Sequence, residues 1–274
     1  MLESARRYLL AHGIDCVGAV SLSRCHITRR YLLERCGFSD TDGLVAIIFA
    51  IPYLTACEEK NISAYAVGRD YHFYCRELFD DILPLLRSAY PDYKFEGFAD
   101  HSPIDEIHAA ALAGLGVLGQ NRLLITEKYS SYVFLAEIVT DAPIKTSDDS
   151  VIRHCEECGL CLESCPMTKC GMCLSALTQK KGELTEDEKR LITQYSSAWG
   201  CDICQETCPH TKKAMNDGTI YTEIEFFKSE SMPRLTTDMI DSMSEEDFKT
   251  RAYSWRGKDT IRRNLLLLEQ NKEN

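Results

Sequence analysis

The chain has 274 residues, 45% of them hydrophobic, and a formal net charge of -11 at pH 7. This length and composition favour a folded protein with a sizeable core, while the acidic balance disfavours broad binding to nucleic acid phosphates. No stretch approaches the roughly 18 apolar residues of a membrane span, and the N-terminus lacks the apolar run of a secretory signal, so we expect a cytoplasmic protein without a membrane partner.

Residues 1–150 are predicted to form an α/β (α+β) domain. Apolar residues at helical spacing predict helices over 4–14, over 71–90 and from 104 to Gly114 or Gly116. Short β-rich runs predict strands over 44–53 and 130–144, which contain the terminating prolines Pro52 and Pro143. This alternation of helix and strand is typical of the class.

The rest of the chain divides into two further parts. A polar stretch at 146–153 is predicted to link the first domain to a cysteine-rich domain at 151–215. The last part, 216–274, is predicted to be a short helical segment, with two short helices and a polar tail in 239–274.

Four cysteines stand at the spacing C-x2-C-x2-C-x3-C-P, at Cys155, Cys158, Cys161 and Cys165. A zinc ribbon uses two separated C-x2-C pairs, whereas here three cysteines fall within one seven-residue loop, as in bacterial ferredoxins. Fourteen cysteines in a cytosolic chain also indicate metal binding more than disulfides. The spacing therefore favours iron-sulfur clusters over zinc.

A second group, Cys201, Cys204 and Cys208, completes two sites except for one ligand. In the ferredoxin run the cysteine before proline binds the other cluster. The same crossover predicts one 4Fe-4S cluster on Cys155, Cys158, Cys161 and Cys208. The other cluster takes Cys165, Cys201 and Cys204 and needs a fourth ligand, either Cys170 or Cys173, and spacing does not choose between them.

Gly114, Gly116 and Gly119 spell G-x-G-x-x-G, the dinucleotide-binding fingerprint. That motif must follow a strand and open a helix, whereas this one follows a predicted helix. A glycine-rich turn that closes the helix and allows close backbone approach is the favoured interpretation. We therefore predict neither a nicotinamide nor a nucleoside triphosphate.

Several stretches together resemble one family, the cobalamin-dependent epoxyqueuosine reductases of tRNA modification. They are "YAVGRDYH" at 65–72, "FADHSP" at 98–103, "AGLGVLGQNRLLIT" at 113–126, "SSYVFLAEIVTDAPI" at 130–144, "MCLSALT" at 172–178, "WRGKDTIRRN" at 255–264 and both cysteine groups. The resemblance covers nearly the whole chain. It implies that Cys173 is the missing cluster ligand and that Cys170 is spare.

The resemblance also implies an oxidoreductase in which two 4Fe-4S clusters deliver electrons to cobalamin, with ferredoxin or flavodoxin as the external donor. Asp100 matches the family's proposed proton donor, and a carboxylic acid donates near neutral pH only where its pKa is raised. Corrin contacts are expected from Asp100 and from six further polar residues, Ser63, Tyr65, Gln120, Asn121, Thr126 and Ser131. Because "DYHFYC" at 70–75 lacks the glycine of D-x-H-x-x-G, we expect His72 to be structural and not a cobalt ligand.

The chain departs from the family pattern in ways that bear on tRNA. Gln120 and Ala64 stand where the family has lysine and arginine, and the chain ends at Asn274 where most members continue into tRNA-holding helical repeats. Two alternatives therefore remain, a corrinoid iron-sulfur reductase acting on a small molecule and a ferredoxin-like electron carrier. Basic residues near the end are expected to contact phosphates or to form a solvated helix face, the commoner case; they are Arg251, Arg256, Lys258, Arg262 and Arg263.

Overall fold

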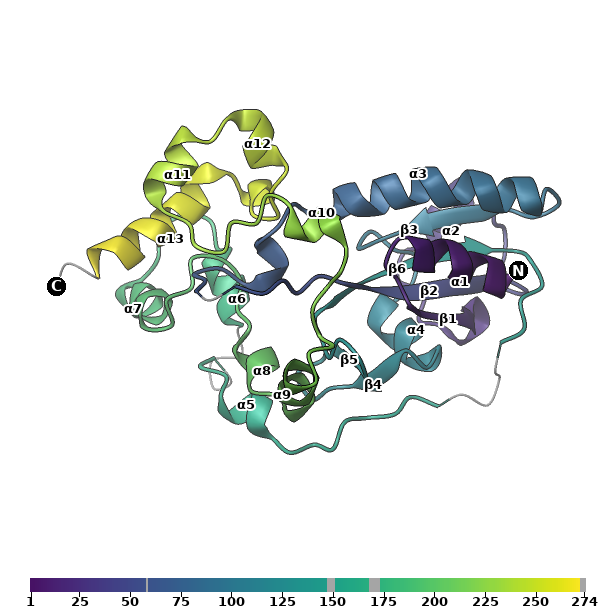
Figure 1. The fold of residues 1–274 in the computed structure, drawn as a ribbon, viewed down its shortest axis with the longest axis horizontal. Helices are drawn as coiled ribbons and strands as arrows, with labels where there is room; N and C mark the ends of the chain where they lie inside the picture. The colour runs from purple at the N-terminus through teal and green to yellow at the C-terminus, as the bar shows by residue number, and fades with distance from the viewer. Residues whose placement is uncertain (58, 147–150, 168–172, 272–274) are drawn as a thin grey trace.

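The computed structural model describes residues 1–57, 59–146, 151–167 and 173–271. Cys170 and the middle of the predicted linker, 147–150, lie outside the described residues. Figure 1 shows two halves. One half contains a sheet and the N-terminus, and the other is helical and contains the C-terminus. Within the described ranges, no helix combines the length and apolar character needed to cross a bilayer.

A four-stranded sheet forms the centre of the first half, in the order β1-β2-β6-β3. Every neighbouring pair is antiparallel. The strands are β1 (Cys16–Ser21), β2 (Val45–Pro52), β3 (Phe95–Phe98) and β6 (Val133–Thr140). The predicted mixture of helix and strand is confirmed, and the antiparallel pairing makes its arrangement α+β.

Helices cover both faces of this sheet. Alternate residues of β2 point to opposite faces, so Ile47 and Phe49 fall on one side and Ile48 on the other. The first side packs against α1 (Leu2–Ala11) and α3 (Tyr71–Ala89). The second side packs against α2 (Arg30–Arg35) and α4 (Glu106–Leu112). These two layers bury all eight residues of β2.

The helix α4 ends where the glycine-rich stretch predicted, with Gly114 in the left-handed region at φ +80°. A small hairpin of β4 (Gly116–Leu118) and β5 (Leu124–Thr126) follows. A Cβ on Gly116 would lie 2.3 Å from the Ile125 carbonyl oxygen, so glycine is required for this close approach. The motif therefore builds a hairpin and does not open a helix.

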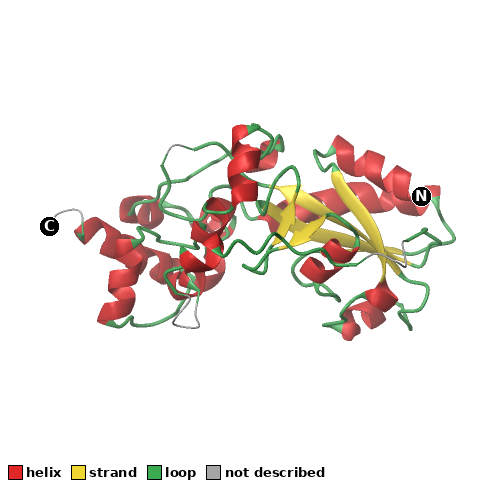
Figure 2. Ribbon diagram, turned by 90° about the horizontal axis from the view of Figure 1, so that it is seen from below, coloured by secondary structure: helices red, strands yellow, loops and turns green. Residues whose placement is uncertain are grey.

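The second half is helical, and Figure 2 shows its strand-free character. Its helices are α5 (Leu160–Glu163), α6 (Leu174–Thr178), α7 (Glu186–Gln194), α8 (Ile203–Glu206), α9 (Pro209–Asn216), α10 (Glu225–Lys228), α11 (Thr237–Ser242), α12 (Glu245–Lys249) and α13 (Lys258–Gln270). A core around Trp199 and Tyr253 also takes in Ile62 and Val67 from the first 150 residues.

The prediction of two short helices and a polar tail in 239–274 holds in part. The segment contains α12 and the thirteen-residue α13, and α11 overlaps its start, so it has more helix than predicted. Ile261, Leu265 and Leu268 recur at helical spacing and are buried in the second-half core, which stabilises α13. The last residues of the predicted tail, 272–274, lie outside the described residues.

Candidate functional site

The four cysteines predicted to bind the first cluster line one small cavity of about 20 Å³. Backbone hydrogen bonds with Leu118 at the end of β4 hold Cys155 beside the hairpin, at 3.1 Å from the Cys155 N–H to the Leu118 oxygen. Cys208 caps the start of α9, which begins with Pro209. The cavity is lined by all four predicted ligands, Cys155, Cys158, Cys161 and Cys208.

The four cysteines predicted to bind the second cluster also lie near one another. Burial raises the pKa of the Cys204 thiol to about 11, against a hydrogen bond from Asn121 that lowers it. Charges on three other cysteines raise it further, namely Cys173, Cys165 and Cys161. Burial likewise raises the pKa of Cys201 to about 12, and Cys173 and Cys204 face it. The structure therefore gathers Cys165, Cys173, Cys201 and Cys204 in one neighbourhood, next to Cys161 of the first group.

The donor set suits iron-sulfur clusters, because cysteine thiolates are the ligands that hold them. The thiols of Cys155, Cys158, Cys161 and Cys208 line one cavity, and burial raises the pKa of several of the predicted ligands. Metal charge is what would keep such buried sulfurs as thiolates.

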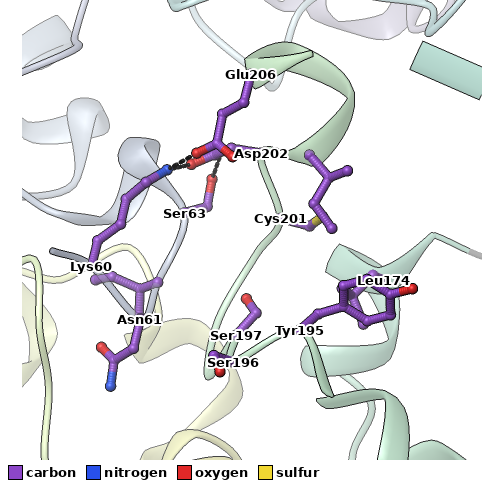
Figure 3. A pocket seen from close by; sticks show the side chains of 12 residues that line it. Lys60, Asn61, Ser63, Leu174, Tyr195, Ser196, Ser197, Cys201, Asp202 and Glu206 are labelled. Atoms are coloured by element: carbon purple, nitrogen blue, oxygen red, sulfur yellow. Dashed lines mark hydrogen bonds and ion pairs between the residues drawn. The ribbon is translucent and has the colours of Figure 1, made fainter. Parts of the chain in front are cut away.

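A hydrogen bond between Ser63 and Asp202 connects the loop that contains Cys201 to the first half of the chain (Figure 3). Asp202 is 2% exposed and accepts hydrogen bonds from Ser63 Oγ and from the Ala64 N–H, the latter at 2.7 Å. Lys60 forms an ion pair with Asp202 and with Glu206. The neighbouring Cys201 lines the same pocket, so this buried network positions a predicted ligand.

Tyr65 packs directly on the turn before Cys201. Gly200 has φ +73°, and a Cβ there would lie 2.4 Å from Ser63 Cβ and 2.9 Å from Tyr65 Cε1. Only glycine allows this contact. Ser63 and Tyr65, both predicted to contact a corrin, therefore lie against the second cysteine group.

The other predicted corrin contacts are divided between three places. Gln120 lines the first cysteine cavity, and its buried Oε1 has no hydrogen-bond partner among the described residues. Asn121 bonds Cys204, as above. Thr126 Oγ1 donates to the Ser130 carbonyl at 3.0 Å and accepts from Tyr129 N–H, which makes it a turn residue. Ser131 donates to Gln205 Oε1 at 3.0 Å.

A separate cavity of about 190 Å³ lies beside Ser131. Its walls are mostly apolar, formed by Ile107, Leu123, Leu124, Val133, Phe134 and Leu135, with Tyr71, Glu106 and Ser131 as polar members. Ser131, which lines this cavity, donates a hydrogen bond to Gln205, the residue that follows Cys204 in the chain. Glu106 Oε1 accepts the Asp100 N–H at 3.2 Å, so the cavity also adjoins the predicted acid.

The pKa of Asp100 is lowered and not raised as expected. Its side chain is 73% exposed and lies 3.7 Å from His72 Nε2, and the hydrogen bond from His72 is the main cause of the lowered pKa. In turn, Asp100 first and Asp70 second raise the pKa of His72 to about 9. At neutral pH the pair therefore holds its proton on the imidazole, and His72 is a partner of the acid.

The His72→Gln substitution is expected to raise the pKa of Asp100, because it removes the positive charge that stabilises the carboxylate. Titration of the Asp100 carboxyl carbon by nuclear magnetic resonance measures the change. His12→Gln is the matched control, since His12 pairs with a different carboxylate, Asp81. An Asp100 titration curve that does not move in His72→Gln contradicts the assignment.

The basic residues near the C-terminus do not form a simple solvated face. Arg251 is buried and donates to the Glu230 carbonyl at 2.7 Å. Lys258 donates to the Met243 carbonyl, Arg262 pairs with Asp241, and Arg263 donates to the Lys180 carbonyl. Arg256 instead stacks on Trp255, which is 59% exposed, with 3.8 Å from Cζ to the ring centroid. Most of these cations therefore have partners within the chain.

Sequence reasoning missed two groups of buried polar residues. Glu137 is fully buried in the central strand β6, and Glu106 begins α4 beside it. A lone acidic residue inside the apolar run "VFLAEIVT" was a usable signal for Glu137. The Lys60–Asp202 pair had no local signal, because its members are 142 positions apart.

No family model matches the chain. An epoxyqueuosine reductase of Lactococcus garvieae is 30% identical over 245 residues, which cover 82% of this chain and 68% of that protein. One from Bacillus subtilis is 31% identical, over 79% of this chain and 58% of that protein. The chain thus spans between about three fifths and two thirds of the length of these relatives.

Solved structures of the same kind of protein share the fold. A crystal structure of epoxyqueuosine reductase with a tRNA-TYR epoxyqueuosine-modified tRNA stem loop aligns with a TM-score of 0.74 and 25% identity, over 97% of this chain and 80% of that chain. A Bacillus subtilis epoxyqueuosine reductase, with an aspartate-bearing catalytic loop swung out of its active site, aligns with a TM-score of 0.72, 25% identity and the same coverage.

Proposed function

This chain belongs to the epoxyqueuosine reductase family, whose members are oxidoreductases, and we propose that it reduces epoxyqueuosine to queuosine in tRNA with cobalamin and two 4Fe-4S clusters. One observation carries the proposal. The cavity lined by Ser131 and Glu106 adjoins a predicted cluster ligand on one side, through Gln205, and the turn of Asp100 on the other. This cavity therefore lies between the proposed source of electrons, the second cluster, and the proposed source of the proton, the turn of Asp100.

We assign residues 1–150 to corrin and substrate binding, 151–215 to the two clusters and 216–274 to a helical covering. The first cluster is assigned to Cys155, Cys158, Cys161 and Cys208, and the second to Cys165, Cys173, Cys201 and Cys204. When bound, these groups supply single electrons and a cobalt centre for reductive removal of the epoxide oxygen. We assign the task of holding the corrin close to the second cluster to four residues whose contacts lie beside the second cluster's predicted ligands, namely Asn121, Ser131, Ser63 and Tyr65.

The chain's own chemical task is to deliver a proton to the departing oxygen. We assign this task to the pair of Asp100 and His72, whose proton resides on His72 at neutral pH. Asp100 is ionised at neutral pH, so it passes a proton to the oxygen only as it receives one from His72, and the pair as a whole gives up the imidazolium proton. Exposure of Asp100 leaves it accessible to a large substrate.

The related structure with a bound stem loop supports tRNA as the substrate class. In this chain, the exposed Trp255 with Arg256 stacked on it offers a platform for a base. The reaction also needs an external electron donor such as ferredoxin or flavodoxin. A reducing cytoplasm suits a chain with this many cysteines, because thiols stay free for metal there.

The cluster assignment is tested on protein reconstituted with iron and sulfide under anaerobic conditions. Two 4Fe-4S clusters correspond to about eight iron atoms per chain. We expect Cys173→Ala to lower this to about four, and the control Cys170→Ala to leave it unchanged. The reverse result would assign the ligand to Cys170.

The function is tested by paramagnetic resonance with added cob(II)alamin, followed by an assay of epoxyqueuosine-modified tRNA. A changed cobalt spectrum together with conversion to queuosine supports the proposal. A changed spectrum without conversion favours a corrinoid reductase that acts on a small molecule. A spectrum identical to that of free cobalamin leaves the ferredoxin-like electron carrier.

A further inference from the structure

Two carboxyl groups, on Glu106 and Glu137, lie near each other at the sheet. Glu137 is 0% exposed and lies on β6 between Ile48 of β2 and Phe98 of β3. Its side chain points to the face that α4 covers, where the half-buried Glu106 opens the helix. The two are close enough for each carboxyl group to affect the pKa of the other.

A hydrogen bond between two carboxyl groups requires a proton on one of them, because an ionised carboxylate only accepts. Glu137 Oε2 is buried and has no donor among the other described residues. Its sister atom Oε1 accepts from Ser102 Oγ. A hydrogen shared between Glu106 and Glu137 would supply the donor that Glu137 Oε2 lacks, and it avoids an unpaired buried charge, which is strongly disfavoured.

The surroundings also favour the protonated state. The titratable groups that face the pair are mostly acidic or neutral, and they are Asp100, Tyr71, Cys75 and Cys25. Arg29 is the cation that faces Glu106, but its guanidinium donates to the Ser102 carbonyl at 3.2 Å. Burial raises the pKa of Glu106 to about 7 and that of Glu137 well above its ordinary value.

Both carboxyl groups hold the turn that contains Asp100. Glu106 Oε1 accepts the Asp100 N–H at 3.2 Å, and Glu137 Oε1 accepts from Ser102. Asp100 has φ +59°, a left-handed conformation that residues other than glycine adopt seldom and that aspartate adopts only as an isolated residue, as in turns. These contacts therefore maintain a backbone conformation that the residue would not prefer alone.

We propose that Glu106 and Glu137 share a single proton and that this shared proton latches the Asp100–Ser102 turn in place. Loss of the proton to solvent puts two negative charges in contact, which separates the carboxyl groups and frees the turn. Both glutamates are positioning residues. The significance for catalysis rests on the proposed function of Asp100, whereas the latch itself is a property of the protein without cofactors.

The test uses the full chain without cofactors, so that failure of the proposed reaction does not affect it. Infrared spectra are expected to show a neutral carboxylic acid band at pH 6 that disappears at higher pH, and this band is expected to be absent from the double variant Glu106→Gln, Glu137→Gln. Exchange of the Asp100 amide hydrogen, divided by its intrinsic rate, is expected to rise about tenfold per pH unit above that titration.

Glutamine at position 106 imitates the protonated state, because its amide donates to Glu137 while its oxygen still accepts the Asp100 N–H. The corrected exchange of Glu106→Gln should therefore stay slow and independent of pH. Glu127→Gln, at an exposed position, is the control and should behave like the wild type. If Glu106→Gln does not fold, Glu137→Gln tests the same pair, since either amide supplies the hydrogen.

Absence of the acid band at pH 6 overturns the proposal. Exchange that rises with pH equally in Glu106→Gln and in the wild type overturns it as well. Slow exchange in Glu106→Gln, together with loss of the acid band in the double variant, supports the latch whether or not tRNA is converted.

Discussion

The Asp100→Asn substitution is expected to lower the rate of epoxyqueuosine reduction by about 10²- to 10⁴-fold, the usual range for removal of an acid catalyst. Asparagine does not titrate in this pH range, so it donates no proton to the leaving oxygen. It also removes the main contact that raises the pKa of His72 to about 9. The neighbouring imidazole then loses its proton at a lower pH, and both members of the pair fail together.

The pH profile separates this mechanism from simple loss of structure. In the wild type, the activity that depends on protonated His72 should fall as pH rises through about 9. In Asp100→Asn the same fall should shift to lower pH, because only Asp70 remains to raise the pKa of the imidazole. Single-turnover conversion of modified tRNA, measured at several pH values, records both effects.

Asp92→Asn is the matched control, since it makes the same change of charge at an exposed turn. Iron content and the cobalt spectrum must be unchanged in both variants. Activity of Asp100→Asn within a factor of about three of the control, well below the range for an acid catalyst, would exclude Asp100 as the acid.

The predicted cluster ligands were the part of the candidate site that needed the least knowledge of the fold. Cysteine spacing is a local property, and three ligands in one short loop need little knowledge of the fold. The strand at β2 was equally clear, because a short apolar run that ends at a proline is typical of a buried strand. The three-residue strands β4 and β5 carried too little periodicity to be recognised.

The electrostatics of the site depend on contacts that no local pattern contains. The pKa of Asp100 is lowered by His72, which comes from another element 28 positions earlier. The family resemblance led to the opposite expectation, because it implied a proton donor at Asp100, and a carboxylic acid donates near neutral pH only where its pKa is raised. The order of the strands is likewise a long-range property, since β2 pairs with β6 about 90 residues later.

The Asp202→Asn substitution is expected to destabilise the protein by about 3 kcal/mol and to lose the second cluster. Asp202 is almost fully buried and receives hydrogen bonds from Ser63, from the Ala64 N–H and from Gln205. Asparagine keeps one acceptor oxygen but removes the charge that balances Lys60. Breaking a buried pair by removing one partner leaves the other charge without adequate compensation.

The effect on the cluster follows from the chain path. Asp202 lies between Cys201 and the helix that carries Cys204, and its contacts fix this loop against residues 63–64. A loosened loop no longer presents both thiols in a fixed arrangement. Denaturant unfolding of the protein without cofactors measures the stability, and iron content after reconstitution measures the cluster.

Glu206→Gln is the matched control for Asp202→Asn. Glu206 pairs with the same Lys60 but is 48% exposed, and an exposed pair of this kind contributes less than about 1 kcal/mol. Equal stability and equal iron content in the two variants would show that the buried carboxylate does not organise the loop. A large loss of stability and of iron confined to Asp202→Asn would instead show that the buried carboxylate fixes the loop of Cys201 and Cys204 against residues 63–64.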